Sequence, residues 1–246
     1  MPNKIALVTG ANKGIGHATA ARLGRLGFTM LVGARDAARG VQAVAALTAD
    51  GIDARPLTLD VTDDASIAAA ARQVEDEFEH LDVLVNNAGI AEPNPAPSQT
   101  TRADMRQVFD VNVFGVVAVT NAFLPLLRRA EAARIVNLSS EVGSLSAVLD
   151  PASPMYALTD LPYTASKTAL NMVTGLYAKE LAGTAIKVSA AIPGYCATDL
   201  NDHTGLRTAD DGASVVTALA TLPADAPTGQ YWGALFATGQ NGAAAW

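Results

Sequence analysis

The sequence predicts one α/β domain, residues 1–246, built on a doubly wound and mainly parallel β-sheet. The main observation is that short apolar runs rich in β-branched residues alternate with longer segments of helical spacing, which is typical of repeated strand–helix units. The second is size, because a chain of 246 residues can bury a sizeable core without disulfides or metals. The third is composition, since 50% apolar and 17% charged residues exclude a disordered chain.

The predicted strands are short and apolar. They are Ile5–Val8, Thr29–Val32, Leu81–Val85, Ile135–Leu138 and Ile186–Ser189. The segments between them place apolar residues at steps of three and four, as at Ile67, Ala71, Val74 and Phe78. Parallel strands bring their carboxyl ends to one edge of the sheet, and ligands bind there. Functional residues are therefore expected directly after each strand.

The first predicted strand ends in a glycine-rich turn. Residues 9–16 read Thr-Gly-Ala-Asn-Lys-Gly-Ile-Gly, and a helical pattern follows. Glycine allows positive φ and a close approach of the backbone, and a helix N-terminus offers free N–H groups to a phosphate. A tight turn without a ligand is the alternative. The nucleotide interpretation takes these residues as the binding turn: Gly10, Asn12, Lys13, Gly14, Ile15 and Gly16.

The second predicted strand is followed by a cation. An acidic side chain here would hold a ribose 2′-hydroxyl, whereas an arginine accommodates a 2′-phosphate. Ala34 and Arg35 occupy this stretch, and Lys13 in the glycine turn can reach the same place. These residues favour NADP over NAD. In the alternative, Asp36 caps the next helix and forms a surface ion pair.

Composition and charge exclude several other classes of protein. The single cysteine, Cys196, excludes an internal disulfide and a cysteine zinc cluster, and it is expected to be a small buried side chain. The three histidines share no metal-like spacing, so no metal is expected. A formal net charge of −7 argues against non-specific nucleic-acid binding and against an anionic membrane surface.

No targeting segment or membrane span is expected. The apolar run Ile5–Val8 is too short for the core of a signal peptide. The uncharged window Val111–Leu127 contains Asn112, Asn121 and Pro125 and is too short to span a bilayer comfortably. The sequence therefore predicts a soluble cytoplasmic protein.

Six motifs follow one another along nearly the whole chain. They are Thr9-Gly10-x-x-x-Gly14-x-Gly16, Asn86-Asn87-Ala88-Gly89, Asn112, Ser139-Ser140, Tyr163-x-x-x-Lys167 and Pro193-Gly194. Each motif alone is weak, but in this order they are very specific. The chain thus resembles the short-chain dehydrogenase/reductase family, which implies a Rossmann-type fold. Residues 12–16 and 33–36 are similar to its NADPH-dependent carbonyl reductase branch, which implies NADP(H) as the cofactor.

Tyr163 and Lys167 are the candidate catalytic pair. They are four positions apart and share one face of a helix. A neighbouring ammonium lowers the pKa of a tyrosine towards working pH, so Tyr163 can donate a proton to a developing alkoxide. For the pair alone, a surface tyrosine packed on a lysine stem is the alternative. Tyr156 has Asp160 at the same spacing and is not a candidate.

Ser140 and Asn112 complete the expected catalytic set. Ser140 follows the strand Ile135–Leu138, where a hydroxyl can polarise a substrate carbonyl. A cap or turn serine is the alternative for Ser140 and for Ser139, and by resemblance the second serine is catalytic. By resemblance too, Asn112 holds a water that relays protons to Lys167. A satisfied core amide is the alternative for Asn112.

Further cofactor contacts follow from the resemblance alone. Asp60, after the run Arg55–Leu59, is expected to accept from the adenine amino group, with Val61 beside it. Asn86 is expected to contact the ribose through its backbone. A helix cap is the alternative for Asp60, and a plain turn for residues 193–194. The other residues expected to contact the cofactor are Ala88, Gly89, Tyr163 and Lys167, together with the nicotinamide loop Pro193, Gly194 and Thr198.

The interval between Ser140 and Tyr163 departs from the family pattern. The two residues are 23 positions apart, and the usual interval is considerably shorter. The extra stretch near 149–161 is expected to form a loop at the substrate mouth, so substrate loops are expected near 145–161 and 198–212. In carbonyl reductases a longer insertion here accompanies a monomeric state. The family implies a homodimer or homotetramer, and a monomer is the alternative.

The predicted function is an oxidoreductase that transfers a hydride from NADPH to the carbonyl group of a ketone or aldehyde, a small-molecule substrate, and gives an alcohol. Tyr163 donates the proton, Ser140 stabilises the oxygen, and Lys167 tunes Tyr163 and holds the ribose. The alternatives are an NAD-dependent alcohol dehydrogenase of the same family and a non-catalytic NADP-binding regulator. An acyl-carrier reductase is disfavoured, because an acidic surface would repel an acidic carrier.

Overall fold

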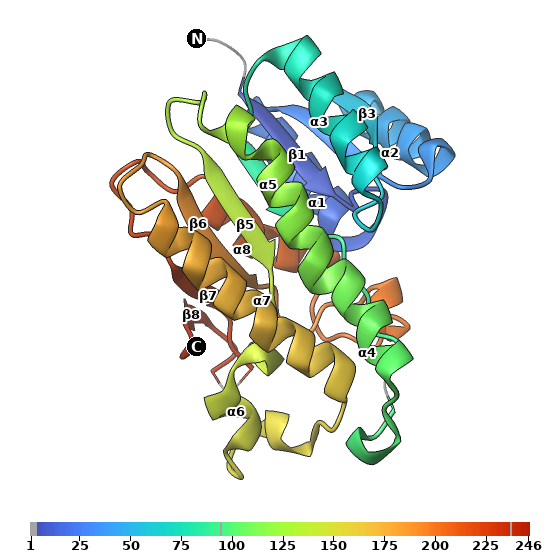
Figure 1. Cartoon of the computed structure of the whole chain (residues 1–246), viewed down its shortest axis with the longest axis vertical. Helices are drawn as coiled ribbons and strands as arrows, with labels where there is room; N and C mark the ends of the chain where they lie inside the picture. Colours follow the sequence, from blue (N-terminus) through green and yellow to red (C-terminus); the bar gives the residue numbers. More distant parts are fainter. Residues whose placement is uncertain (1–3, 94, 237) are drawn as a thin grey trace.

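The computed structural model describes residues 4–93, 95–236 and 238–246, with one eight-stranded sheet at the centre (Figure 1). The strand order is β3-β2-β1-β4-β5-β6-β7-β8. The strands β1 to β7 pair in parallel, and β8 pairs antiparallel with β7. The predicted α/β fold is therefore confirmed. The strand bounds are β1 (Ile5–Thr9), β2 (Thr29–Ala34), β3 (Ala54–Thr58), β4 (Val83–Asn86), β5 (Arg134–Leu138), β6 (Lys187–Ile192), β7 (Gln230–Ala234) and β8 (Asn241–Ala243).

Helices cover both faces of the sheet. One core cluster joins the sheet to α3, α5 and α7, and a second joins it to α1, α2 and α8. Figure 1 shows α3, α5 and α7 in front of the sheet and α8 behind it. The helix bounds are α1 (Gly14–Arg25), α2 (Ala37–Ala49), α3 (Asp64–Phe78), α4 (Arg102–Phe109), α5 (Gly115–Leu127), α6 (Leu145–Leu149), α7 (Leu161–Glu180) and α8 (Ala209–Ala220).

Strand β1 supplies both cores with alternate residues. Ile5 and Leu7 belong to the cluster under α3, α5 and α7, while Ala6 and Val8 belong to the cluster under α1, α2 and α8. Every residue of β1 is buried, as expected for a parallel strand covered on both faces. Burying a side chain such as Leu7 completely is worth roughly 1.5–3 kcal/mol. The strand therefore holds its carboxyl end firmly in place.

The strands at the two edges of the sheet are less apolar than the predicted ones. β3 contains Arg55 and Pro56, and Leu57 is its one buried residue. β8 reads Asn-Gly-Ala. An edge strand is paired on one side only, so it tolerates polar residues and proline. For this reason the apolar pattern predicts β1, β2, β4, β5 and β6 and misses the edge strands β3 and β8. It also misses β7, which reads Gln-Tyr-Trp-Gly-Ala and lacks a run of β-branched residues.

One helical stretch, Arg102–Leu127, is long and apolar enough by composition alone to cross a membrane, with a hydropathy of 1.6. It comprises α4, a π-helical turn at Asp110–Phe114 and α5. Half of its apolar window is buried inside the protein, and Phe123 and Leu127 belong to a core cluster. A core helix passes the same test, so this stretch is weak evidence for a membrane span.

The order of the strands places the topological switch point of the sheet between β1 and β4. The chain adds β2 and β3 on one side of β1, and then crosses over to add β4 to β7 on the other side. Ligands of open α/β sheets bind at the carboxyl ends of the strands beside such a switch point. The segment from β5 to α7 lies at this same end of the molecule (Figure 1). The fold therefore brings the predicted site residues to one region.

Candidate active site

The turn after β1 requires glycine at three positions. Gly10 and Gly14 have φ values of +63° and +57°, a region that favours glycine. At Gly16, a Cβ atom would lie 2.4 Å from Nδ2 of Asn87 and 2.8 Å from the carbonyl oxygen of Gly10. A side chain at Gly16 would therefore push the turn away from β4. The glycines bring the N-terminus of α1 to the switch point.

Asn87 braces this turn against β4. Its Nδ2 donates to the carbonyl oxygen of Thr9 at 2.8 Å. The hydroxyl of Thr9 accepts from the backbone N–H groups of Asn87 and Ala88 at 3.0 and 2.9 Å. These bonds join the two strand ends at the switch point. No role for Asn87 is predicted from the sequence, because a bracing amide has no pattern of its own.

The N-terminus of α1 has no side-chain cap among the described residues. Its N-cap residue is Lys13, and its first turn holds no acidic residue. By contrast, α2, α3, α7 and α8 are capped by side chains, those of Asp36, Asp63, Asp160 and Thr208. The free N–H groups and the positive end of the α1 dipole therefore suit a bound phosphate.

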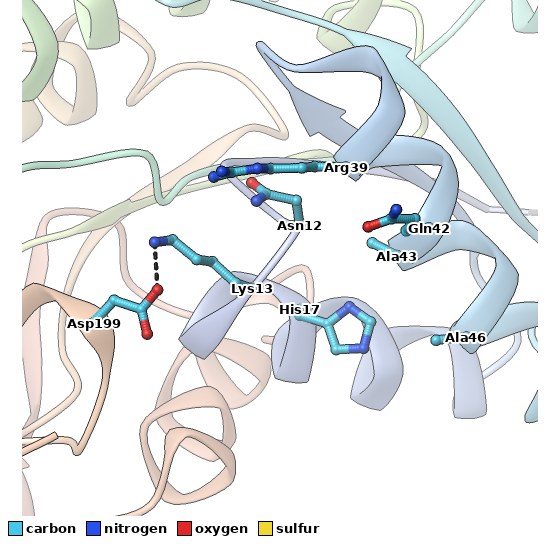
Figure 2. A pocket seen from close by; sticks show the side chains of 8 residues that line it. All are labelled: Asn12, Lys13, His17, Arg39, Gln42, Ala43, Ala46 and Asp199. Carbon is cyan, nitrogen blue, oxygen red and sulfur yellow. Dashed lines mark hydrogen bonds and ion pairs between the residues drawn. The ribbon is translucent and has the colours of Figure 1, made fainter.

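A cavity of about 550 Å³ lies beside the glycine turn (Figure 2). Two cations border it, Lys13 from the turn and Arg39 from α2. Nζ of Lys13 lies 2.5 Å from Oδ2 of Asp199, which belongs to the loop after β6. Cations next to a helix N-terminus suit a phosphorylated ligand. The residues that line the cavity are Asn12, Lys13, His17, Arg39, Gln42, Ala43, Ala46 and Asp199.

Among the described residues, Arg39 lines this cavity and Arg35 does not. Arg35 is exposed just after β2, where its charge acts on the carboxyl group of Asp60. Asp36 accepts from the backbone N–H of Arg39 at 3.0 Å and lies 3.8 Å from its Nε, so the cap and the surface ion pair are both present. The role of Arg39 is missed from the sequence, because it depends on which turn of α2 faces the cavity.

Asp60 forms a turn of its own. Its Oδ1 accepts from the backbone N–H of Thr62 at 2.9 Å and from the Thr62 hydroxyl at 2.7 Å. Asp63, rather than Asp60, caps α3, so the helix-cap alternative is wrong. The backbone hydrogen bond from Thr62 is the main cause that lowers the pKa of Asp60, which keeps it ionised as an acceptor. Val61 packs on α5, where a Cβ at Gly115 would lie 3.2 Å from that of Val61.

Asn86 is buried at the end of β4. Its Nδ2 donates to the hydroxyl of Thr120 at 3.1 Å and to Oδ1 of Asn137 at 2.9 Å. These bonds tie β4 to α5 and β5. The side chain is therefore structural, and the predicted ribose contact would fall to the backbone of Asn86.

Ser140 and Tyr163 meet where β5 ends and α7 begins. The Ser140 side chain lies close enough to the phenol of Tyr163 to lower its pKa. It makes no cap bond to the short helical turn that follows it, among the described residues. Ser139 is buried instead, and its hydroxyl donates to Oδ1 of Asn171 at 2.6 Å. Of the two serines, Ser140 is therefore the one that faces Tyr163.

Lys167 lies one turn after Tyr163 on the same face of α7. Its Nζ is 5.4 Å from the centroid of the Tyr163 ring and donates to the carbonyl oxygen of Leu138 at 2.8 Å. Only 5% of the Lys167 residue is exposed. This burial lowers the pKa of Lys167 to about 8, because the ammonium loses its hydration.

Burial also shifts the pKa of Tyr163, and the shift is upward, whereas the sequence predicts a lowered pKa. Desolvation raises the pKa of Tyr163 to about 12, although the side chain of Ser140 acts to lower it. The charge of Asp160, the N-cap of α7, raises this pKa further. The sequence suggests the neighbouring ammonium but not the desolvation of the phenol, which is the largest cause of the shift. Tyr163 therefore keeps its proton at neutral pH, as a proton donor must.

Asn112 lies in the π-helical turn between α4 and α5 and is fully buried. Its Nδ2 donates to the carbonyl oxygen of Ile90 at 2.8 Å and to the hydroxyl of Ser166 at 3.0 Å, and its Oδ1 accepts from the N–H of Ile90 at 2.9 Å. A Cβ at Gly89 would lie 3.3 Å from this Oδ1 and 3.8 Å from Nζ of Lys167. Asn112 thus orders the loop beside Lys167, and its water relay stays a prediction.

The loop after β6 reaches over the glycine turn. A Cβ at Gly14 would lie 3.6 Å from Cγ2 of Thr198. Pro193 and Ile15 both approach Gly212 at the start of α8, where a Cβ would lie 3.2 and 3.3 Å from their side chains. The predicted nicotinamide loop and the predicted phosphate turn are therefore neighbours.

The hairpin β7–β8 supports the segment that carries Ser140. The hydroxyl of Tyr231, on β7, donates to the backbone carbonyl oxygen of Ser140 at 2.5 Å. The backbone N–H of Phe236 donates to Oε2 of Glu141 at 2.7 Å. Tyr231 is 2% exposed, and its ring stacks on Trp246. This contact joins residues 91 positions apart, which no local pattern reveals.

The arrangement has counterparts among known proteins. Residues 4–208 match the model of a family described as short chain dehydrogenase. The chain is 40% identical over 223 residues to short-chain dehydrogenase anuI of Penicillium roqueforti, with 88% of each chain covered. It resembles the structure of NADPH-bound carbonyl reductase from chicken fatty liver, with 29% identity, a TM-score of 0.85 and 100% of each chain covered. It also resembles 3-ketoacyl-(acyl-carrier-protein) reductase from Brucella melitensis complexed with NADH, with 26% identity, a TM-score of 0.80, and 92% and 94% covered.

Proposed function

Because this chain belongs to the short-chain dehydrogenase family of oxidoreductases, we propose that it reduces a ketone or aldehyde to an alcohol with NADPH as the reductant. The observation that carries the proposal is the meeting of Ser140, Tyr163 and Lys167 at the carboxyl end of β5. A hydroxyl, a protonated phenol and an ammonium are the groups that a carbonyl oxygen needs when it gains negative charge.

The glycine turn and the cavity beside it fit a nicotinamide dinucleotide. The turn leaves no room for a Cβ at Gly16, and α1 has no side-chain cap within the described residues, so the diphosphate would lie on residues 12–16. Lys13 and Arg39 would hold the 2′-phosphate. The ionised Asp60 would accept from the adenine amino group. When bound, the reduced nicotinamide supplies the hydride.

The protein's own residues manage the oxygen of the substrate. The hydroxyls of Ser140 and Tyr163 donate to the carbonyl oxygen, so its carbon becomes more electrophilic. As that carbon gains a hydride, the oxygen takes the proton of Tyr163, and the product is the alcohol. The ammonium of Lys167 stabilises the resulting phenolate until a proton from solvent restores Tyr163. Loss of either hydroxyl removes charge stabilisation that is needed mainly in the transition state.

The cations support NADPH as the preferred cofactor. Two positive side chains border the cavity, and the residue that ends β2 is Ala34, which carries no acid to hold a bare 2′-hydroxyl. The similar carbonyl reductase is NADPH-bound, whereas the similar ketoacyl reductase is complexed with NADH. The family fold therefore serves both cofactors, and the charges of this chain favour the phosphorylated one.

A screen of NADPH oxidation over ketones, aldehydes and diketones tests the proposal. We expect turnover with at least one carbonyl compound, and slower turnover with NADH. Faster turnover with NADH would favour the NAD-dependent alcohol dehydrogenase. Tight binding of NADPH without turnover of any compound would favour the non-catalytic regulator.

A further inference from the structure

Two segments form the substrate side of the site, 141–161 and 195–206, and we name them together the collar. We propose that the collar binds a neutral carbonyl compound with a bulky apolar body, and that it discriminates against anionic substrates. This proposal rests on the proposed function, and it adds the chemical class of the substrate.

The collar lies next to the reacting groups because of how the chain is connected. Its first segment leaves Ser140 and returns to α7 two residues before Tyr163. Within this segment, α6 packs against the helical turns at Glu141–Gly143 and Pro154–Ala157. The second segment follows the loop at Gly194, and its Thr198 approaches the glycine turn. Figure 1 shows the first segment at the lower end of the molecule, where β5 ends.

The collar carries an unusual share of exposed apolar side chains. Among the described residues, fifteen large apolar side chains are exposed, and eight of them lie in the collar. Within each of the two segments these side chains follow one another closely along the chain, and clustered apolar groups mark a binding surface more often than scattered ones do. The eight residues are 37–81% exposed: Leu145, Leu149, Tyr156, Leu158, Leu161, Tyr195, Leu200 and Leu206.

The charges of the collar oppose an anionic substrate. The collar contains five acidic residues and no lysine or arginine. Among the described residues, cations pair only with the second segment, where Lys13 bonds to Asp199 and Arg207 follows directly. Against the first segment a carboxylate or phosphate on the substrate would lose water, and the acidic groups there would repel it. A neutral ketone meets no such penalty, and its hydrocarbon body can cover the exposed leucines. The exposed apolar area of the collar and the lack of lysine and arginine in its first segment therefore both favour a neutral, apolar substrate.

The test compares unbranched methyl ketones of increasing length with ionised 3-oxo acids of the same length. We expect kcat/KM to rise about fourfold for each added methylene while the chain lies on the collar. We expect each 3-oxo acid to be at least about tenfold poorer than the matching ketone. A flat ketone series, or 3-oxo acids that are equal or better substrates, would overturn the proposal.

Variants locate the effect on the collar. The double substitution Leu149→Asn with Leu158→Asn should flatten the ketone series, so that kcat/KM no longer rises with each added methylene. The matched control is Leu26→Asn, because Leu26 is 61% exposed at the end of α1, outside the collar. An unchanged series in the double variant, or a change in its oligomeric state instead, would overturn the proposal. Failure to reduce 2,3-butanedione or any other carbonyl would count against the proposed function itself.

An independent observation concerns Tyr231. We infer that Tyr231 is a positioning residue for Ser140. Its buried hydroxyl donates to the backbone carbonyl oxygen of Ser140, and the N–H of Gly143 donates to the same oxygen at 2.9 Å. The ring of Tyr231 is held against Trp246 at a centroid distance of 5.1 Å. The hairpin β7–β8 therefore sets the backbone from which the Ser140 hydroxyl reaches the substrate.

Tyr231→Phe removes only the hydroxyl and should lower kcat about three- to tenfold, with the KM for NADPH unchanged. The control is Tyr177→Phe, which removes a hydroxyl that donates to Oδ1 of Asn121 at 2.7 Å, away from Ser140. The decisive variant adds Ser140→Ala. In that background Tyr231→Phe should have no further effect on kcat, because Tyr231 acts through Ser140. An equal loss of kcat in both backgrounds, or the same loss in Tyr177→Phe, would overturn the inference.

Discussion

The chemistry of individual residues here is set by burial as much as by their neighbours. Tyr163 keeps its proton because a buried phenolate is costly, and Lys167 holds its proton weakly because a buried ammonium is costly. A protonated Tyr163 suits the start of the reaction, and the ammonium of Lys167 suits the phenolate that is left at its end. Tyr163 is ready to donate, and the nearby ammonium of Lys167 would offset part of the cost of the phenolate left behind.

Removal of the proton donor should abolish most of the activity. Tyr163→Phe should lower kcat by roughly 10²–10⁴-fold, the usual contribution of a general acid, while NADPH still binds. Steady-state kinetics together with a fluorescence titration of NADPH would measure both quantities. Tyr156→Phe is the control, because Tyr156 is exposed in the collar and lacks a lysine one turn later. Near-normal turnover in Tyr163→Phe would refute the mechanism.

The buried charge of Lys167 should lower the unfolding free energy of the protein at neutral pH. Its pKa is about 8 in the folded protein and 10.5 when unperturbed, so the folded state binds this proton less tightly. The penalty is complete below pH 8 and disappears as the pH rises through 10.5. Between these limits the wild type should gain roughly 1–3 kcal/mol of unfolding free energy relative to Lys167→Met. Urea unfolding of both proteins at several pH values measures this difference, and a constant difference would contradict the assignment.

Arg39 and Arg35 should differ in their effect on cofactor choice. Arg39→Ala should weaken NADPH binding about ten- to a hundredfold, because it removes a charge-assisted hydrogen bond, and should leave NADH nearly unchanged. The sequence predicts the 2′-phosphate contact for Arg35, but among the described residues Arg35 does not line the cavity, so Arg35→Ala should weaken NADPH binding less than Arg39→Ala does. Measurement of kcat/KM with both cofactors separates the two arginines. If Arg39→Ala lowered kcat/KM equally with NADPH and NADH, the role of Arg39 would lie in the fold rather than at the phosphate.

At the scale of elements, the site is built from strand ends and helix starts. The glycine turn places the uncapped end of α1 at the switch point, and β5 and α7 bring Ser140 to Tyr163. These elements are predictable, because β1 and β5 are apolar runs and residues 9–16 carry the glycine pattern. Arg39 and Asn87 are not predictable in the same way. Their roles depend on the rotation of α2 and on the packing of β4 beside β1, which only the folded chain defines.

The collar can be predicted from the sequence, whereas the contact between the hairpin β7–β8 and Ser140 cannot. The interval of 23 positions between Ser140 and Tyr163 predicts an extra loop, which the structure forms as α6 and two short helical turns. Nothing in the sequence near Tyr231 indicates its bond to Ser140, since β7 pairs with β6 and meets Ser140 only through the tertiary fold. Local patterns thus predict the reacting groups, while the residues that hold them come from distant parts of the chain.

The glycine turn offers a test at this scale. Gly16→Ala should lower the affinity for NADPH at least about tenfold and reduce stability, because the new Cβ would collide with Nδ2 of Asn87. Gly175→Ala is the control, since a Cβ at this position of α7 meets no other atom within 4 Å. It should stabilise the protein by about 0.5–1 kcal/mol. Thermal unfolding without NADPH measures the stability of each variant, and the shift in Tm on adding NADPH measures its affinity for NADPH. A wild-type affinity in Gly16→Ala would contradict the role of the turn.

For the molecule as a whole, the fold collects groups from distant parts of the sequence into one reaction centre. The glycine turn follows β1, Ser140 follows β5, the predicted nicotinamide loop follows β6, and the hairpin β7–β8 supports Ser140. Both core clusters fix these strands in register, so the strand ends cannot move independently. The central claim is that this centre passes a hydride to a carbonyl carbon.

Transfer of deuterium tests that claim most directly. The enzyme would be incubated with an apolar methyl ketone and NADPH that carries deuterium at C4 of the reduced nicotinamide, and the alcohol would be analysed by mass spectrometry. Reduced nicotinamide carries two hydrogens at C4, so two singly deuterated forms of NADPH would be tested. One of these two forms should give an alcohol with a single deuterium on the carbinol carbon. Tyr163→Phe should give almost none. If NADPH bound to the wild type but neither labelled form delivered deuterium to any ketone or aldehyde, the account would be contradicted.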